Sequence, residues 1–187
     1  MKKRCFWVNN DPLYIEYHDT EWGKPVYDDE TLFEFLLLES FQAGLSWITI
    51  LKKRENFREA FDNFDYKKIA KYNQDKFDEL ILNAGIIRNK LKVKSAITNA
   101  QLFMEIQKEF GSFSTFIWNY VDGKPILNTF KTREEVPATT TLSDVISKDL
   151  KKRGFKFVGS TIIYAFMQAI GMVNDHTTDC FCYEKCV

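Results

Sequence analysis

The sequence predicts an all-helical protein of 187 residues that folds as a single domain over residues 1–187. Three observations favour this fold class. Apolar residues recur at helical spacing through most of the chain, alternating strand patterns are scarce, and 45% of the residues are hydrophobic. A chain of this length and composition can bury a sizeable core, either as one unit or as two closely packed lobes.

The predicted helices follow one another along the chain. The first, 28–44, opens with acidic residues suited to a helix N-terminus and ends at Gly44. Segment 122–141 holds two of the four prolines and many polar residues, so we expect it to be a loop or the connection between lobes. The remaining helices are expected over 46–64, 74–84, 88–110, 112–121, 141–154 and 160–171.

Charge and hydropathy limit the classes of function. The 26 basic and 26 acidic residues cancel, so no protein-wide field attracts this molecule to nucleic acid or to an anionic membrane, and any attraction to polyanions must be local. No apolar run reaches the length of a membrane span, and the N-terminus turns polar before a signal-peptide core could form. We therefore expect a cytoplasmic protein with no membrane contact.

The cysteines and histidines gather at the two ends of the chain. Cys5 and His18 have twelve residues between them, whereas His176 and Cys180 have three. In a reducing compartment thiols or metal ligands are expected in place of disulfides. Two Cys/His pairs supply the four ligands of a closed tetrahedral zinc site, which would join both termini. The fourth ligand position has three candidates, of which the H-x3-C spacing favours the first without settling the choice: Cys180, Cys182 and Cys186.

Glu39 follows four apolar residues on a helix that periodicity would bury, so its carboxylate must find a partner or line a cavity. The alternative is a helix-end carboxylate that reaches solvent or caps the following turn. Nearby aromatic residues favour a functional acid because they could form a flat-walled slot around it, although aromatics at helical spacing usually belong to the core. These aromatics are Tyr14, Tyr17, Trp22 and Trp47.

Segment 80–97, LILNAGIIRNKLKVKSAI, joins two predicted helices through a turn that contains a glycine. Such a hairpin points backbone N–H groups outward at the start of the second helix, where an anion such as DNA phosphate can bind. By itself this signal is weak, because any helix pair needs a turn and a run of charges is usually a solvated face. The expected DNA-binding residues are Gly85, Ile86, Arg88 and Lys90. Further phosphate contacts are expected from the basic clusters 52–54 and 151–153.

Four long motifs give the chain a specific resemblance to a known family. They are DPLYIEYHDTEWG at 11–23, AGLSWITILKKREN at 43–56, AGIIRNKLK at 84–92 and LKKRGFKFVGSTIIYAFMQAIGMVNDH at 150–176. In this order they resemble the Tag family of 3-methyladenine DNA glycosylases, which belongs to the helix-hairpin-helix glycosylases. The resemblance extends from Cys5 to about Cys180 and implies a two-lobed helical fold, whose smaller lobe holds both termini and the zinc site.

The resemblance also implies roles for individual residues. The enzyme would excise 3-methyladenine from double-stranded DNA, as a monomer, and leave an abasic site for base excision repair. The zinc would be structural, because four protein ligands leave no open position for an activated water. The implied zinc ligands are Cys5, His18, His176 and Cys180. The implied base pocket has Glu39 as its acid and Tyr14, Tyr17 and Trp47 as its walls, with Trp7 and Trp22 nearby.

The expected chemistry follows from the lesion. Methylation at N3 puts positive charge on adenine and weakens its bond to deoxyribose, so the base can leave without a strong acid. Glu39 would accept hydrogen bonds from the base edge, and its charge would favour a cationic lesion. Flipping the nucleotide costs a few kcal/mol, whereas stacking on Tyr17 and Trp47 contributes roughly 1–3 kcal/mol per base.

One departure from the wider helix-hairpin-helix glycosylases bears on the mechanism. The chain lacks the Asp that many helix-hairpin-helix glycosylases place downstream of the hairpin, as does the Tag family, and no lysine stands out as a Schiff-base nucleophile. A monofunctional glycosylase is therefore expected.

Two other functions are possible alternatives. A non-catalytic DNA-binding module would not need an acid facing an aromatic slot. A small-molecule enzyme with a Cys nucleophile would lack a base, since both histidines are assigned to zinc.

Overall fold

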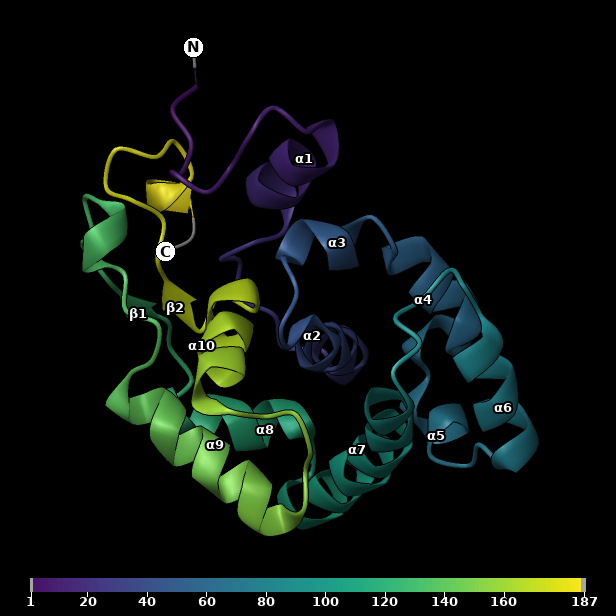
Figure 1. Ribbon diagram of the computed structural model, residues 1–187. Helices are drawn as coiled ribbons and strands as arrows, with labels where there is room; N and C mark the ends of the chain where they lie inside the picture. The colour runs from purple at the N-terminus through teal and green to yellow at the C-terminus, as the bar shows by residue number, and fades with distance from the viewer. Residues whose placement is uncertain (1, 186–187) are drawn as a thin grey trace.

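The computed structural model describes residues 2–185, and most of its elements are helices arranged around one central helix, α2 (Figure 1). The predicted all-helical fold class is confirmed. The α-helices are α1 (Pro12–Thr20), α2 (Asp29–Gln42), α3 (Trp47–Leu51), α4 (Arg54–Ala60), α5 (Tyr66–Ile69), α6 (Gln74–Leu82), α7 (Lys90–Phe110), α8 (Phe113–Trp118), α9 (Thr141–Arg153) and α10 (Ser160–Ala169). The short 3-10 helices and strands are η1 (Asp62–Phe64), η2 (Asn119–Val121), η3 (Arg133–Glu135), η4 (Tyr183–Lys185), β1 (Ile126–Leu127) and β2 (Val173–Asn174).

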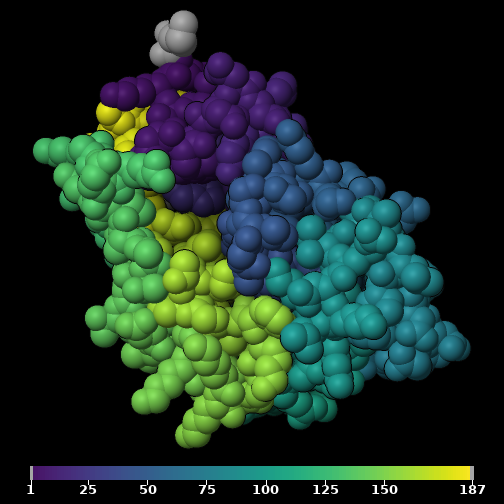
Figure 2. All heavy atoms as spheres, in the orientation of Figure 1, coloured from purple at the N-terminus to yellow at the C-terminus, as the bar shows by residue number. Residues whose placement is uncertain are grey.

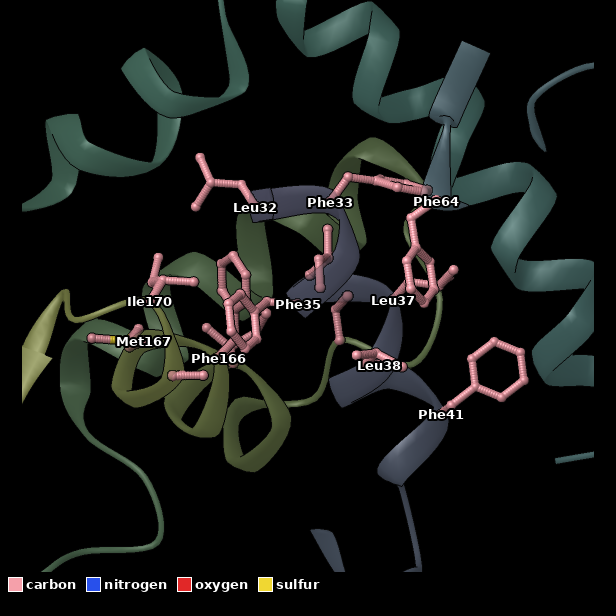
Figure 3. Close-up of a cluster of buried hydrophobic side chains, with 14 of the residues drawn as sticks. Leu32, Phe33, Phe35, Leu37, Leu38, Phe41, Phe64, Phe166, Met167 and Ile170 are labelled. Atoms are coloured by element: carbon pink, nitrogen blue, oxygen red, sulfur yellow. The ribbon is translucent and has the colours of Figure 1, made fainter. Parts of the chain in front are cut away.

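Helix α2 forms the centre of the core. It begins where the Asp28 side chain accepts a hydrogen bond from the Thr31 amide at 2.8 Å, and it stops before Gly44, which has a φ of +80°. Between Leu32 and Phe41 every side chain of the helix is buried except Glu34, which is half-buried. Figure 3 shows Phe35 of this helix beside Phe166, whereas Phe33 lies toward Phe64 and Phe41 points to the opposite side of the helix. A helix that is apolar on all sides has to be buried, which explains its central position.

Segment 46–64, predicted as one helix, is instead divided into α3, α4 and η1. The apolar residues explain the break. Leu51 and Phe57 are six positions apart, so on one straight helix they would point about 120° away from each other. Both side chains are buried, and the interruption at Lys52 and Lys53 lets each of them face the core.

The other predicted helices are found close to their expected bounds. An additional helix, α1, lies in the N-terminal segment, where Asp11 caps the first turn and Pro12 occupies its first position. Segment 122–141 is mostly loop, as expected, but β1 within it pairs in parallel with β2 near the C-terminus. This two-residue pairing fixes the loop beside the last helix.

The two ends of the described chain come together on one side of the molecule (Figure 1). Gly171, which follows α10 with a φ of +67°, permits this approach, because a Cβ there would lie 2.3 Å from the carbonyl carbon of Lys24. The Val26 amide donates to the Ile170 carbonyl in the same region. Segment 24–26 and residues 170–171, which precede β2, are thereby held in close contact.

Helices α3 to α7 lie on one side of α2, and α9, α10, β1 and β2 lie on the other, where the termini are nearest to the two strands (Figure 1). The predicted division into a larger lobe and a smaller lobe with both termini stays a prediction. Among the described residues, no helix is long and apolar enough to cross a membrane.

Candidate functional site

A cavity of about 320 Å³ lies between the N-terminal segment, α2, α3, α10 and the loop before α9. These segments meet on the face seen in Figure 2, where the N-terminal residues are purple and α10 is yellow-green. The volume is within the range of small-molecule pockets. The predicted pocket residues Trp7, Tyr14, Tyr17, Trp22, Glu39 and Trp47 all line this cavity.

Glu39 lies within α2 and is only 3% exposed, so it is neither a cap nor a solvated helix-end carboxylate. Its Oε2 atom has no hydrogen-bond partner among the described residues. Burial raises the pKa of Glu39 to about 8. Glu39 is therefore largely protonated at neutral pH. A ligand that donates a hydrogen bond to the carboxylate or carries a positive charge would favour the ionised form that burial disfavours.

The aromatic residues form a connected wall around this acid. The rings of Tyr17 and Trp47 lie 5.3 Å apart, and Trp7 contacts Tyr14 and Trp22 at centroid distances of 5.2 and 5.0 Å. The indole Nε1 atoms of Trp7 and Trp47 are buried without a hydrogen-bond partner among the described residues. Unsatisfied buried polar groups are rare in native proteins and call for an explanation. A ligand that offers both a donor and acceptors would satisfy them.

Another part of the cavity wall was not predicted from the sequence. It comes from α10 and from the chain just after β2, and it includes Asp175, which is 2% exposed. Residues 136–138 of the loop also contribute. The signal that could have found Asp175 is its place in the polar run 174–176, which follows the mostly apolar segment 160–173. The loop residues carry no comparable signal, because only β1 and β2 bring them to the site.

The predicted metal ligands from both chain ends come together in one buried group. Cys5 Sγ lies 3.3 Å from His176 Nδ1, and Cys180 Sγ lies 3.5 Å from the same atom and 3.4 Å from His18 Nε2. All four ligand atoms lie within 4.8 Å of one another. The hydrogen bond from Cys5 lowers the pKa of Cys180, so the group carries a thiolate that a cation would neutralise. This group could hold a metal ion.

The second nitrogen of each histidine is already engaged by the protein. His18 Nδ1 lies 2.8 Å from an oxygen of Asp19, and His176 Nε2 lies 3.2 Å from the Trp22 carbonyl. Metal-binding histidines usually donate their outer N–H to such acceptors, which fixes the ring and leaves the other nitrogen for the metal. Asp19 also accepts two hydrogen bonds from Arg4, which lower the pKa of Asp19 to about 2.

The structure distinguishes between two of the three candidates for the fourth ligand. Cys180 belongs to the group of four, whereas the Cys182 thiol lies 4.0 Å from the His18 carbonyl and forms a separate set with His18 and Asp19. That set offers only three ligand atoms. Cys186 lies outside the described residues.

The expected DNA-binding hairpin connects α6 and α7. Asn89 caps α7 through hydrogen bonds from the amides of Leu91 and Lys92, while Arg88 and Lys90 are exposed. Gly85 has an ordinary negative φ, but a Cβ there would lie 3.0 Å from Asn83 Oδ1 and 3.2 Å from Asn56. A larger residue at position 85 would therefore require the side chains of Asn83 and Asn56 to shift.

Three of the basic or hairpin residues have buried side chains. The Ile86 side chain is 3% exposed and belongs to the core, so a DNA contact by this residue would have to come from its backbone. Lys92 is also buried and donates to the carbonyls of Phe41 and Ala43 at the end of α2. Arg54, from the cluster 52–54, is likewise buried.

Arg54 forms a paired charge network inside the protein. Its guanidinium donates to Glu34 at 2.6 Å and to Glu21 at 2.7 and 2.9 Å, which ties α4 to α2 and to the residue after α1. Lys53 donates to the carbonyls of Ala84 and Gly85 and so holds the hairpin turn. These contacts assign a structural role to two members of the predicted phosphate-binding cluster.

Replacing Lys90 with Ala is expected to make the slope of log DNA affinity against log salt shallower by about one unit, because the exposed ammonium would neutralise one phosphate. Lys108→Ala is a suitable control, since Lys108 lies at the far end of α7 and pairs with Glu105. Binding titrations at several salt concentrations measure both slopes. An unchanged slope for the Lys90 variant means that its side chain is only solvated.

The arrangement defines a class of protein: a helical protein with an exposed basic hairpin and an aromatic pocket around a buried acid. Comparison with known proteins then identifies the family. The sequence model described as methyladenine glycosylase matches residues 7–183. The chain therefore belongs to the methyladenine glycosylase family.

Individual relatives agree with this assignment. The chain is 50% identical over 181 residues to DNA-3-methyladenine glycosylase 1 of Escherichia coli strain K12, with 97% of each chain covered. It is 50% identical over 182 residues to DNA-3-methyladenine glycosylase of Haemophilus influenzae, and the match covers 97% of this chain and 98% of that protein. A crystal structure of 3-methyladenine DNA glycosylase I superposes with a TM-score of 0.94 at 50% identity, covering 97% of this chain and 100% of that chain. A variant of 3-methyladenine DNA glycosylase I, solved in complex with 3-methyladenine, superposes with a TM-score of 0.92 at 38% identity. The match covers 95% of this chain and 96% of that chain.

Proposed function

We propose that the cavity around Glu39 binds a 3-methyladenine nucleotide flipped out of alkylated DNA, and that this chain hydrolyses the bond between the base and the sugar. Family membership makes the chain a DNA glycosylase of alkylation repair. The observation that carries the pocket assignment is the set of buried polar atoms without partners: Glu39 Oε2, Trp7 Nε1 and Trp47 Nε1. One acceptor and two donors between aromatic rings suit the edge and faces of a purine.

The reaction needs little acid because the lesion is already cationic. When the C1′–N9 bond breaks, its electron pair goes to the base, which leaves neutral, and the positive charge passes to the sugar. Water adds at C1′ and loses a proton, so the products are free 3-methyladenine and an abasic site. Glu39 would hold the exocyclic amine, and Tyr17 and Trp47 would stack on the ring. The described lining residues include no lysine, which supports a monofunctional enzyme that forms no Schiff base.

The proposed cofactor is one structural zinc ion held by the four Cys and His ligands. In a tetrahedral site, zinc bonds of about 2.3 Å to sulfur and 2.0–2.1 Å to nitrogen put the two kinds of ligand atom about 3.6 Å apart. The observed separations of 3.3, 3.4 and 3.5 Å fit this geometry. Two sulfurs with two nitrogens suit zinc, and such an ion would join residues 5–18 to 176–180 without taking part in the reaction.

Double-stranded DNA is the proposed partner, bound by a monomer. The hairpin between α6 and α7 would contact the phosphate backbone through Gly85, Arg88 and Lys90, which would position the protein without reading sequence. Flipping would then deliver the damaged base to the cavity.

Release of free base tests this function directly. The purified protein is incubated with DNA that has been alkylated at adenine N3, and the released base is identified by chromatography. Free 3-methyladenine is expected, together with unbroken strands that are cleaved only when alkali is added. No release above background would overturn the proposed function, whereas strand cleavage without alkali would overturn the monofunctional mechanism.

A further inference from the structure

The cavity wall has an unbalanced set of charges. Among the described residues that line it, two are acidic, Glu39 and Asp175, and none is Lys, Arg or His. Glu39 comes from α2, whereas Asp175 follows β2, so the two carboxyl groups belong to different parts of the wall. The proposed mechanism uses Glu39 and assigns nothing to Asp175.

Three hydrogen bonds hold the Asp175 side chain in place as an acceptor. Its Oδ1 atom accepts from Asn128 Nδ2 at 2.6 Å, and its Oδ2 atom accepts from Tyr164 Oη at 2.6 Å and from Gln168 Nε2 at 2.8 Å. An ionised carboxylate is an acceptor only, and it matches three donors that converge on both oxygens. No ion pair within the described part of the chain includes Asp175.

A buried carboxylate whose hydrogen-bond partners are neutral acts on its surroundings through its charge. Asp175 is 2% exposed, so little solvent screens it, and a unit charge in such a place affects other charges several ångströms away. Its partners come from the chain after β1 and from α10, which hold it in place before any ligand arrives. A charge fixed in advance needs no rearrangement when a ligand binds.

Glu39 cannot supply this charge alone. Burial raises its pKa to about 8, so in the empty cavity at neutral pH it is mostly protonated when the base enters. Glu39 can recognise the purine edge through hydrogen bonds. A negative charge that is present before the base binds must come from another residue of the cavity wall. Asp175 is the other acidic residue of the described lining.

We propose that Asp175 is a specificity-determining residue whose fixed negative charge makes the cavity prefer a cationic purine to a neutral one of the same shape. This inference rests on the proposed function, because it assumes that a methylated purine enters the cavity. It also has a consequence for turnover. Once the glycosidic bond breaks the base is neutral, so the attraction to Asp175 is lost and the product is held less tightly than the lesion.

Two isosteric probes test the inference. The first is the 3,9-dimethyladeninium cation, in which a methyl group replaces the sugar; the second is 3-deaza-3,9-dimethyladenine, which has the same shape and no charge. Their dissociation constants are measured by calorimetry for the parent protein and for Asp175→Asn. We expect the variant to bind the cation roughly tenfold more weakly and to bind the neutral probe within about twofold of the parent. An equal loss for both probes would make Asp175 a purely structural residue and overturn the inference.

A matched control separates charge from general damage. Asp149 also accepts a hydrogen bond from a tyrosine, Tyr120, at 2.6 Å, but it lies on α9 and does not line the cavity. Asp149→Asn is therefore expected to leave the cation-to-neutral ratio at the parent value. Metal content and melting curves show whether the Asp175 variant, which is adjacent to His176, retains its fold.

If Asp175→Asn does not fold, the Glu39→Gln variant tests the role of Asp175 instead. With Glu39 uncharged, the preference for the cationic probe should persist, because Asp175 remains in the wall. Equal binding of the two probes by this variant would refute the inference. Release of 3-methyladenine by the parent protein is a separate result: its absence defeats the proposed function, whereas its presence together with equal probe binding defeats only the role of Asp175.

Discussion

Replacing Glu39 with Gln is expected to lower the rate of 3-methyladenine excision by about ten- to a hundredfold or more without unfolding the protein. The substitution keeps the size of the side chain, but the new side chain cannot ionise when a cationic base binds, and one acceptor oxygen is exchanged for a donor. Facing the exocyclic amine of the base, it would place two donors together. Hydrogen bonds to charged groups contribute about 1.5–3 kcal/mol, and each 1.36 kcal/mol changes a rate tenfold.

The same variant is expected to melt at a higher temperature than the parent, with a difference that grows as the pH rises. Burial raises the pKa of Glu39 from 4.5 to about 8, so the folded protein holds a proton there that the unfolded chain gives up. Between these two values the parent loses stability as the pH rises, whereas Gln does not titrate. The difference in free energy of unfolding at pH 8 should reach about 2–4 kcal/mol.

Paired melting curves and excision assays at pH 5 and pH 8 measure both effects. Glu34→Gln is a matched control on the same helix, because Glu34 accepts from Arg54 and Arg58 and its loss leaves buried positive charge unpaired. That variant should melt lower than the parent. If Glu39→Gln also melts lower, or if it keeps full activity, Glu39 is a structural carboxylate and not the acid of the pocket.

Local patterns in the sequence were sufficient for the features that depend on neighbouring residues. The uniformly apolar stretch of α2 predicts a central helix, and Glu39 stands out within it because a carboxylate there has no local explanation. The Cys and His residues at the two ends predict a shared site because no other histidines exist in the chain. In both cases the chemistry of the residue limits where it can lie.

Features that depend on long-range packing could not be predicted in this way. Arg54 and Lys92 look like part of two basic clusters, but each is buried against a partner more than 15 residues away in the chain. Ile86 is core although it lies in the hairpin turn. Asp175 joins the cavity only because β2 pairs with β1 and because Gly171 permits the close approach of Lys24. Periodicity carries no information about such contacts.

Loss of the metal ion is expected to destabilise the protein more than any single substitution in the pocket. Cys5→Ser should lower the zinc content from about one ion per chain to a small fraction and reduce the melting temperature by about 10 °C or more. A structural zinc contributes folding free energy directly, and a protein of this size shifts by about 2–4 °C for each kcal/mol lost. Elemental analysis and calorimetry measure the two quantities.

Cys182→Ser is the matched control, because Cys182 is also a buried cysteine at the same end of the chain but lies outside the group of four ligands. It should retain zinc and melt near the parent. Excision should fall in Cys5→Ser, since the segment fixed by Cys5 and His18 also carries Trp7, Tyr14 and Tyr17 into the cavity wall. Zinc retained by Cys5→Ser, or lost from Cys182→Ser, would show that the assigned ligands are wrong. If zinc were lost but activity persisted at low temperature, the ion would only stabilise the fold, and the aromatic wall would keep its place through packing alone.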